Sequence, residues 1–208
     1  EKLKDPARLG KCSLPRGLKA QLRPYQARGF QWLSFLSELG FGGCLADDMG
    51  LGKTVQMIAF LLARRAQGAK RVHLIVVPTS LLENWKTEME RFAPGLRYAV
   101  LHASGLSASE ARELLPGLDA LITTYGMIAR VPWLREEEFD CVVLDEAQAI
   151  KNAGTAQARA VKKLKGARRF LMTGTPVENR LTDLWSLFDF ANPGLLGTAA
   201  EFKHYLKK

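Results

Sequence analysis

Asp47-Asp48-Met49-Gly50-Leu51-Gly52-Lys53-Thr54 lies between a short apolar segment, residues 43–46, and a run with helical periodicity. A strand, a glycine-rich turn carrying Lys-Thr and a helix form the arrangement that binds a nucleoside triphosphate. Gly50 and Gly52 let the backbone approach the phosphates, so that N–H groups and the helix N-terminus face the negative charge. Lys53 would reach the β- and γ-phosphates, and the Thr54 hydroxyl would bind magnesium.

One position departs from the general phosphate-binding pattern, which begins with glycine. Asp47 stands at that position here. Taken alone, a Gly-Lys-Thr also occurs in ordinary loops that precede a helix, and this is the alternative interpretation of the octapeptide.

An acidic pair follows a second apolar stretch. Residues 139–144, Phe-Asp-Cys-Val-Val-Leu, are almost uninterrupted in apolar character, as expected of a strand covered on both faces. Asp145 and Glu146 come next, and carboxylates at the end of a buried strand are costly unless they hold a cation or manage a proton. Asp145 would hold magnesium, and Glu146 would polarise the attacking water. The alternative is a solvated strand end, but together with the octapeptide the pair indicates ATP hydrolysis.

From about Leu22 to Tyr205, the motifs and their order resemble the Swi/Snf-type ATPases within superfamily 2 of helicase-like motors. The phosphate-binding loop of that family also begins with an acidic residue, which accounts for Asp47. The resemblance implies that Gln26 contacts the adenine base. It also implies a nucleotide-binding loop that consists of Asp48, Met49, Gly50, Leu51, Gly52, Lys53 and Thr54.

The same resemblance assigns residues to nucleic acid and to coupling. Segments 77–85 and 122–125 are similar to the two nucleic-acid segments of the family's first lobe, and segment 171–176 is similar to its coupling motif. Segment 179–197 is the most family-specific part. The implied nucleic-acid contacts are Thr79, Thr124, Lys151 and Asn152. The implied coupling residues are Gln148, which stands where many relatives carry His, with Thr173, Gly174 and Thr175.

The resemblance implies the first, RecA-like lobe of an ATP-dependent motor that moves along double-stranded DNA and displaces or remodels DNA-bound proteins. A second RecA-like lobe would supply the arginine that completes the site, so residues 1–208 alone are expected to show negligible ATPase activity. Segment 184–197 and the Thr-Gly-Thr-Pro coupling motif argue against the alternative of a strand-separating DNA or RNA helicase. A non-catalytic ATP- and DNA-binding module is a third alternative. The compact spacing of the motifs resembles prokaryotic members.

Length and composition agree with one domain. The 208 residues are 47% hydrophobic, enough to bury a core. We expect residues 1–20 to be a linker or the end of an upstream segment and residues 21–208 to form the lobe. Because the chain begins at Glu1 and ends in two lysines, we expect a fragment of a longer protein that lacks the second lobe. No apolar run has the length of a membrane span, and no secretory leader is recognisable. The expected location is cytoplasmic, on the nucleoid of a prokaryote, or nuclear in a eukaryote.

The formal net charge of +9 is distributed unevenly. Seven Lys or Arg and no acidic residue lie between Lys151 and Phe170. A solvated amphipathic helix and a phosphate-contacting face explain this cluster equally well. Trp85 and Trp185 are expected to be core anchors, because each falls at helical spacing with other apolar residues. Among the cysteines, Cys44 and Cys141 are expected to be core residues rather than disulfide or zinc ligands.

Strands and helices alternate along the chain, which predicts an α/β fold of the RecA-like kind, a three-layer sandwich with a mainly parallel sheet. Five candidate segments each follow a predicted strand: the phosphate loop, Thr79, Thr124, the acidic pair and Thr173. They would therefore share one carboxyl edge, where open α/β sheets bind ligands. Strands are predicted at 43–46, 72–77, 98–101, 120–123, 139–144 and 170–172. Helices are predicted at 24–39, after the octapeptide as far as Gly68, and at 78–92, 109–115, 155–164, 182–191 and 199–206.

Overall fold

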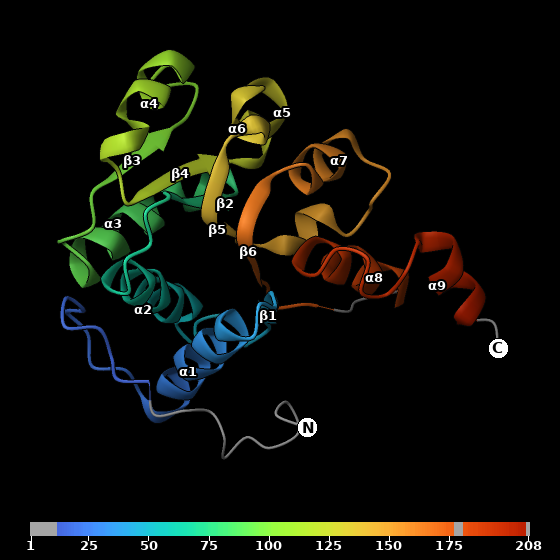
Figure 1. Cartoon of the computed structure of the whole chain (residues 1–208), viewed down its shortest axis with the longest axis horizontal. Coiled ribbons are helices and arrows are strands. Elements are labelled where there is room, and N and C mark those ends of the chain that lie inside the picture. The colour runs from blue at the N-terminus through green and yellow to red at the C-terminus, as the bar shows by residue number, and fades with distance from the viewer. Residues whose placement is uncertain (1–11, 177–180, 207–208) are drawn as a thin grey trace.

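The computed structural model describes residues 12–176 and 181–206, in which a six-stranded sheet lies between two layers of helices (Figure 1). The strand order is β1-β6-β5-β2-β4-β3, and every neighbouring pair is parallel. The predicted α/β class is therefore confirmed. The strands are β1 (Gly43–Leu45), β2 (His73–Val77), β3 (Tyr98–Leu101), β4 (Ala120–Thr124), β5 (Glu138–Leu144) and β6 (Lys165–Met172).

Helices fill the intervals between the strands. Short polar residues begin three of them: Ser107, Thr155 and Thr198 each accept a hydrogen bond from the main-chain N–H three residues further on. The α-helices are α1 (Pro24–Glu38), α2 (Lys53–Ala66), α3 (Leu82–Phe92), α4 (Ala108–Leu114), α5 (Tyr125–Arg130), α6 (Trp133–Glu136), α7 (Ala156–Lys162), α8 (Leu181–Ala191) and α9 (Ala199–Tyr205). The 3-10 turns are η3 (Thr79–Leu81), η4 (Leu115–Gly117) and η5 (Ala147–Ile150).

Alternate residues of the central strands face opposite layers. Ile75 and Val77 of β2 pack with α1, α2 and α3, whereas Leu74 and Val76 pack with α5, α7 and α8. Every residue of β2 is buried, which is the pattern expected of a strand covered on both faces. Each layer of helices thus has its own apolar cluster, with the sheet between them (Figure 1).

Strand β6 is longer than the sequence predicts. It begins at Lys165 rather than Phe170, and pairs with β5 from Glu138 onward. Its first half is basic and alternates between exposed and half-buried positions, so apolar periodicity gives no signal there. The sequence also did not predict helices α5 and α6, because each is too short to show a helical period.

Asn192, just after α8, connects the family-specific segment to the strand of the phosphate loop. Its Oδ1 accepts a hydrogen bond from the Gly42 N–H at 2.9 Å, and its Nδ2 donates to the Gly42 carbonyl at 3.2 Å. A Cβ at position 42 would lie 2.2 Å from the carbonyl oxygen of Arg169, so only glycine fits this close approach. Residues 179 and 180 of the same segment lie outside the described residues.

Residues 12–22 lie against helices α2 and α3. Leu18 and Leu22 pack on the apolar cluster of these helices, and the Lys19 N–H donates to the Phe92 carbonyl at 2.7 Å. The expected linker at residues 1–20 stays a prediction, since residues 1–11 lie outside the described part of the chain. Within that part, no helix combines the length and the apolar character needed to cross a bilayer.

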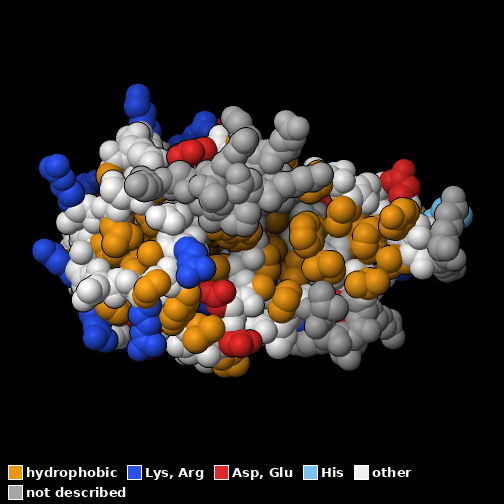
Figure 2. All heavy atoms as spheres, turned by 90° about the horizontal axis from the view of Figure 1, so that it is seen from below, with side chains coloured by type: hydrophobic (Ala, Val, Ile, Leu, Met, Phe, Trp, Pro, Cys, Tyr) orange, Lys and Arg blue, Asp and Glu red, His pale blue; other side chains and the backbone are white. Residues whose placement is uncertain are grey.

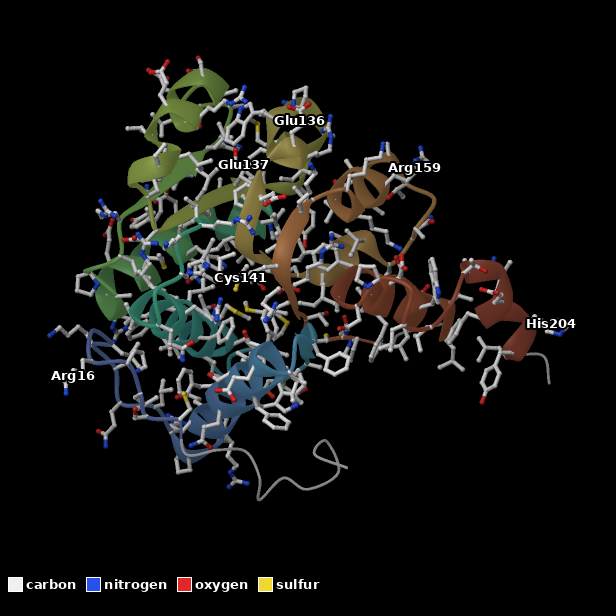
Figure 3. All side chains as sticks on the ribbon, viewed as in Figure 1. Arg16, Glu136, Glu137, Cys141, Arg159 and His204 are labelled. Atoms are coloured by element: carbon white, nitrogen blue, oxygen red, sulfur yellow. The ribbon has the colours of Figure 1, made fainter. Side chains whose placement is uncertain are left out.

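A buried ionic group lies between α2 and the starts of β2 and β5. Arg64 donates two hydrogen bonds to Asp140, at 3.1 and 2.7 Å. His73 is fully buried, and its Nδ1 lies 3.5 Å from an Asp140 oxygen. Cys141, buried near the middle of the molecule, faces the same carboxylate (Figure 3). Because the Arg64 guanidinium balances the Asp140 charge, the group is an ion pair within the core. Cys12, Cys44 and Cys141 are free thiols, and the expected core position is confirmed for Cys141.

We predict that His73 makes the fold sensitive to acid. Burial, assisted by the charges of Arg64 and Arg65, lowers the pKa of His73 to about 4, although Asp140 opposes the shift. In the unfolded chain the pKa of histidine is about 6.5, so as the pH falls below that value the unfolded state takes up the proton first. Stability is therefore lost between about pH 6.5 and 4, by roughly 3 kcal/mol in total.

Replacing the histidine should remove this loss. In urea unfolding at a series of pH values, His73→Gln should show a smaller fall in the free energy of unfolding than the wild type over that interval. His102→Gln, at a half-buried histidine elsewhere, is the matched control and should keep the wild-type slope. An equal slope in wild type and His73→Gln would contradict the assignment.

Candidate active site

The five candidate segments meet at one edge of the sheet, as predicted. Because all pairings are parallel, the carboxyl ends of β1, β2, β4, β5 and β6 lie along the same edge. Val77 is paired with Thr124, so the segments that begin at Thr79 and Thr124 leave neighbouring strands side by side. Leu45, before the phosphate loop, is paired with Met172, before Thr173.

The phosphate loop has the backbone that its glycines allow. Gly50 and Gly52 adopt φ values of 80° and 75°, in the left-handed region, and Gly52 is the N-cap of α2. Lys53 is the first residue of that helix and only 9% exposed. Its ammonium donates to the Asp47 and Asp48 carbonyls at 2.7 and 3.1 Å, so its charge lies inside the loop. Main-chain N–H groups, a helix start and a cation therefore converge at this loop, the chemistry that a polyphosphate needs.

Asp47 is held by Gln56, a residue that the sequence did not single out. Gln56 is fully buried on α2, and its Nε2 donates to the Asp47 carboxylate at 3.1 Å and to the Gly52 carbonyl at 3.3 Å. A Cβ at Gly29 of α1 would lie 1.9 Å from Gln56 Oε1, so glycine is needed there to make room. The acid at the first position of the loop thus has a structural role, because it helps to hold the loop against α2.

Gln26 and Tyr25 support the loop from α1. The Gln26 Nε2 donates to the Leu51 carbonyl at 3.1 Å, and the Tyr25 hydroxyl donates to the same oxygen at 3.2 Å. The Gln26 Oε1 accepts the Arg23 N–H at 2.9 Å. Each polar atom of the Gln26 amide retains one further donor or acceptor position. The adenine contact implied for Gln26 stays a prediction.

Asp145 is buried at the end of β5 and is surrounded by donors. Its Oδ2 accepts the Trp85 indole N–H at 2.8 Å, and its Oδ1 accepts the Glu146 N–H at 2.9 Å. Its carbonyl accepts the Tyr125 hydroxyl at 2.7 Å. Burial raises the pKa of Asp145, although the bonds from Trp85 and Glu146 and the charge of Lys53 oppose the shift. Loss of one such donor would cost about 1–3 kcal/mol, because water does not replace it easily.

Glu146 has a strained backbone and a bridging neighbour. Its φ of 49° is the only positive value among the described non-glycine residues, a conformation that costs on the order of 1–3 kcal/mol and often marks functional sites. Gln148 Nε2 donates to the Glu146 carboxylate at 2.6 Å, and Gln148 Oε1 accepts the Thr173 hydroxyl at 3.0 Å. The Thr175 N–H in turn donates to Thr173 at 3.1 Å. A glutamine thus connects the acidic pair to the coupling segment, because its amide both donates and accepts.

The phosphate loop and β1, the strand before it, also lie close to the coupling segment. A Cβ at Gly174 would lie 3.1 Å from the side chain of Met49, which is 79% exposed. The Thr173 N–H donates to the Leu45 carbonyl at 3.2 Å. The structure therefore brings together three sets of residues that the sequence separates widely: the phosphate loop, the acidic pair and the coupling residues.

The residues present fit a magnesium ion. Thr54, the second residue of α2, offers a hydroxyl and Asp145 offers a carboxylate, both of them the hard oxygen ligands that magnesium prefers. The buried Asp145 carboxylate has a raised pKa, so a cation nearby would relieve the cost of its charge. Thr54 and Asp145 would hold the ion.

The expected nucleic-acid residues fall into two groups. Thr79 is exposed at the start of η3, and Thr124 is buried at the start of α5, where its side chain does not cap the helix. Lys151 and Asn152 follow η5 and line a cavity of about 700 Å³ bounded by α8 and α9. No phosphate-loop residue lines that cavity.

Trp85 is fully buried, which confirms its expected place in the core, whereas Trp185 is half-buried and lines that same cavity. The Trp185 indole donates to the Gly197 carbonyl at 3.1 Å, and Lys162 Nζ lies 4.4 Å from its ring centroid. Exposed hydrophobic side chains gather toward the end of the molecule that contains α9 (Figure 2).

Much of the basic cluster at 151–170 makes contacts within the chain. Lys162 pairs with Asp189 at 2.8 Å, and Arg168 Nε donates to the Ser37 carbonyl at 2.7 Å. Arg159 and Arg169 also donate to main-chain carbonyls. These contacts favour a structural role for this part of the cluster.

Known proteins are similar to this chain in sequence. A sequence profile of the SNF2-related domain matches residues 25–208. The putative ATP-dependent helicase/translocase YwqA of Bacillus subtilis is 47% identical over 192 residues, and the TATA-binding protein-associated factor MOT1 of Saccharomyces cerevisiae is 35% identical over 221. These matches cover 90% and 100% of this chain but only 21% and 12% of the relatives.

Solved structures agree with the sequence comparison. The Sulfolobus solfataricus SWI2/SNF2 ATPase core in complex with dsDNA superposes with a TM-score of 0.85 and 47% identity, covering 91% of this chain and 40% of that one. A second structure of the Sulfolobus solfataricus SWI2/SNF2 ATPase core domain superposes with a TM-score of 0.80. The family match covers most of the chain, including the parallel sheet, the phosphate loop after β1 and the acidic pair after β5. The chain therefore belongs to the SNF2-related domain family.

Proposed function

We propose that this chain is the ATP-binding first lobe of an ATP-dependent motor that moves along double-stranded DNA and displaces or remodels proteins bound to it. The observation that carries the proposal is the shared carboxyl edge, where the phosphate loop, the acidic pair and the segments at Thr79 and Thr124 lie together. ATP chemistry and phosphate-backbone contacts would then occur on one rim. The Sulfolobus solfataricus core solved in complex with dsDNA supports a duplex as the partner.

The site residues would divide the work of phosphoryl transfer. Lys53 and the N–H groups of the loop would hold the β- and γ-phosphates, and Gln26 would contact the adenine. Magnesium held by Thr54 and Asp145 would neutralise charge on the phosphates. Glu146 would orient the attacking water and accept its proton, and Gln148 would connect that step to Thr173, Gly174 and Thr175. A second lobe would supply the arginine that P-loop motors usually employ, and with it about three to five orders of magnitude in rate.

DNA would be bound through its backbone. Thr79, Thr124, Lys151 and Asn152 would contact phosphates, which position a duplex without reading its sequence. Such binding suits a motor that acts on any DNA, in the nucleoid of a prokaryote or in a nucleus. A strand-separating helicase is the second candidate, and the name of the Bacillus relative, helicase/translocase, leaves both open.

Removing the phosphate-site charge should abolish hydrolysis. In the full-length protein, Lys53→Ala should lower kcat for ATP by at least about 100-fold, because one preorganised cation is lost. Phosphate release measures the effect, and Lys70→Ala, at an exposed lysine outside the site, is the matched control. Wild-type turnover in Lys53→Ala, with the control also active, would show that the loop does not hold the phosphates.

Glu146→Gln should separate binding from chemistry. The substitution keeps the side-chain shape but removes the base, so hydrolysis should fall about 100- to 10,000-fold while ATP affinity changes little. Isothermal titration with ATP and phosphate release would be measured together, with Glu113→Gln on α4 as the control. If hydrolysis is unchanged, the base lies elsewhere.

The type of motor is tested by two substrates. Full-length protein with ATP should displace the third strand of a triplex and show a duplex-stimulated ATPase, but should not separate a tailed duplex into single strands. Lys53→Ala controls for the requirement for ATP. Strand separation without triplex displacement would favour the helicase instead.

A further inference from the structure

Two buried hydrogen bonds reach Asp145 from opposite faces of the sheet. Trp85, on α3, belongs to the apolar cluster of α1, α2 and α3, and its indole N–H donates to Asp145 Oδ2 at 2.8 Å. Tyr125, the first residue of α5, belongs to the cluster of the other face, and its hydroxyl donates to the Asp145 carbonyl at 2.7 Å. Asp145 is thus held in both its side chain and its main chain.

Both donors are attached to the segments proposed to contact DNA. Helix α3 directly follows the turn η3, which begins at Thr79. Tyr125 directly follows Thr124. A displacement of either segment would therefore be transmitted to Asp145 through one helix or one peptide bond and one buried hydrogen bond.

The hydrogen bonds of Trp85 and Tyr125 differ from those of other tryptophan and tyrosine side chains in the residue that accepts them. Trp133 donates its indole N–H to the Ala108 carbonyl at 3.0 Å, and Tyr98 donates its hydroxyl to Glu90 at 2.9 Å; neither bond reaches the site. Trp85 instead occupies one oxygen of the proposed magnesium ligand, while the Glu146 N–H occupies the other. The two N–H donors together set the rotation of that carboxylate.

Solvent cannot readily replace either of these two hydrogen bonds. Trp85 is fully buried, and Tyr125 and Asp145 are each 5% exposed, so water has little access to replace a lost donor. A carboxylate released from Trp85 is free to rotate about its side-chain bonds. Misplacement of a catalytic group by about 1 Å can cost about 100-fold in rate.

We propose that Trp85 and Tyr125 are positioning residues that couple duplex binding to the nucleotide site, by fixing Asp145 according to the position of the Thr79 and Thr124 segments. The proposal rests on the proposed function, since it needs DNA at those segments. The connection from each segment to Asp145 is physically contiguous and consists of packed helices and hydrogen bonds.

The test measures coupling by binding alone. Full-length wild type, Trp85→Phe, Tyr125→Phe and the double variant are titrated with fluorescent duplex DNA, with and without a non-hydrolysable ATP analogue and magnesium. The ratio of the two duplex affinities is the coupling factor, and linkage requires that DNA changes the analogue's affinity by the same factor. Typical factors are about 5- to 150-fold.

The variants should lose the coupling factor and keep duplex affinity. In the double variant the factor should fall toward 1, while the affinity for duplex without nucleotide stays within about twofold of wild type. The duplex-stimulated increase in kcat should fall about tenfold or more. Trp133→Phe and Tyr98→Phe, which remove the same donor groups away from the site, should retain the wild-type factor.

Two outcomes would overturn the proposal in distinguishable ways. A wild-type coupling factor in the double variant would show that Trp85 and Tyr125 are merely structural, and would leave the proposed function intact. A wild-type protein whose duplex affinity ignores the nucleotide and whose ATPase ignores duplex would overturn the proposed function, and this inference with it. Thermal unfolding checks the fold of each variant; Tyr125→Phe, which removes a single oxygen, carries the test if Trp85→Phe does not fold.

Discussion

The parallel pairing of the six strands is the constraint on which the candidate site depends. Each strand enters the sheet in the same direction, so each loop that follows a strand is delivered to the same edge. β5 lies between β6 and β2, and this order sets the acidic pair between the coupling segment on one side and the Thr79 segment on the other. The hydrogen bonds that Asp145 receives from Trp85 and Tyr125 follow from that order, because the helices after β2 and β4 pack on opposite faces beside it.

Burial imposes a second condition on this edge. A carboxylate at the end of a strand covered on both faces has little contact with water, so its lone pairs must be met by protein donors or by a cation. Trp85 and the Glu146 N–H meet two of them, one on each oxygen, and the lone pairs that remain suit a hard metal ion. Glu146, next to Asp145, adopts a strained left-handed backbone at the point where the chain enters η5. Its carboxylate accepts a hydrogen bond from Gln148.

Local patterns of apolar residues and glycines in the sequence are sufficient to predict most of the fold. The apolar runs before Asp145 and before Thr79 predicted buried parallel strands, and the glycines of the phosphate loop predicted its turn. The pattern did not extend to the basic first half of β6, where hydrogen bonds to β5 rather than apolar side chains hold the strand. Helices α5 and α6 have six and four residues, which is less than the window over which a helical period can be recognised.

The supporting contacts of the site could not be predicted in the same way. Trp85 was correctly expected in the core, but nothing in its helical spacing reveals where its indole N–H points. The bonds of Gln56 to Asp47 and of Gln148 to Thr173 join residues whose proximity arises only when the sheet is assembled.

The placement of β1 has a consequence for the order in which the protein is made. β1 pairs with β6, and Gly42 is bonded to Asn192, a residue 150 positions further along the chain. A ribosome therefore releases the phosphate loop well before β6, and β1 lacks its pairing partner until β6 has emerged. Long-range parallel pairing of this kind is slow, because the intervening loop must be closed before any contact is gained. The nucleotide pocket consequently matures only after β6 has been made, so nascent chains that stall before β6 would expose an unpaired β1 and would not yet bind a nucleotide.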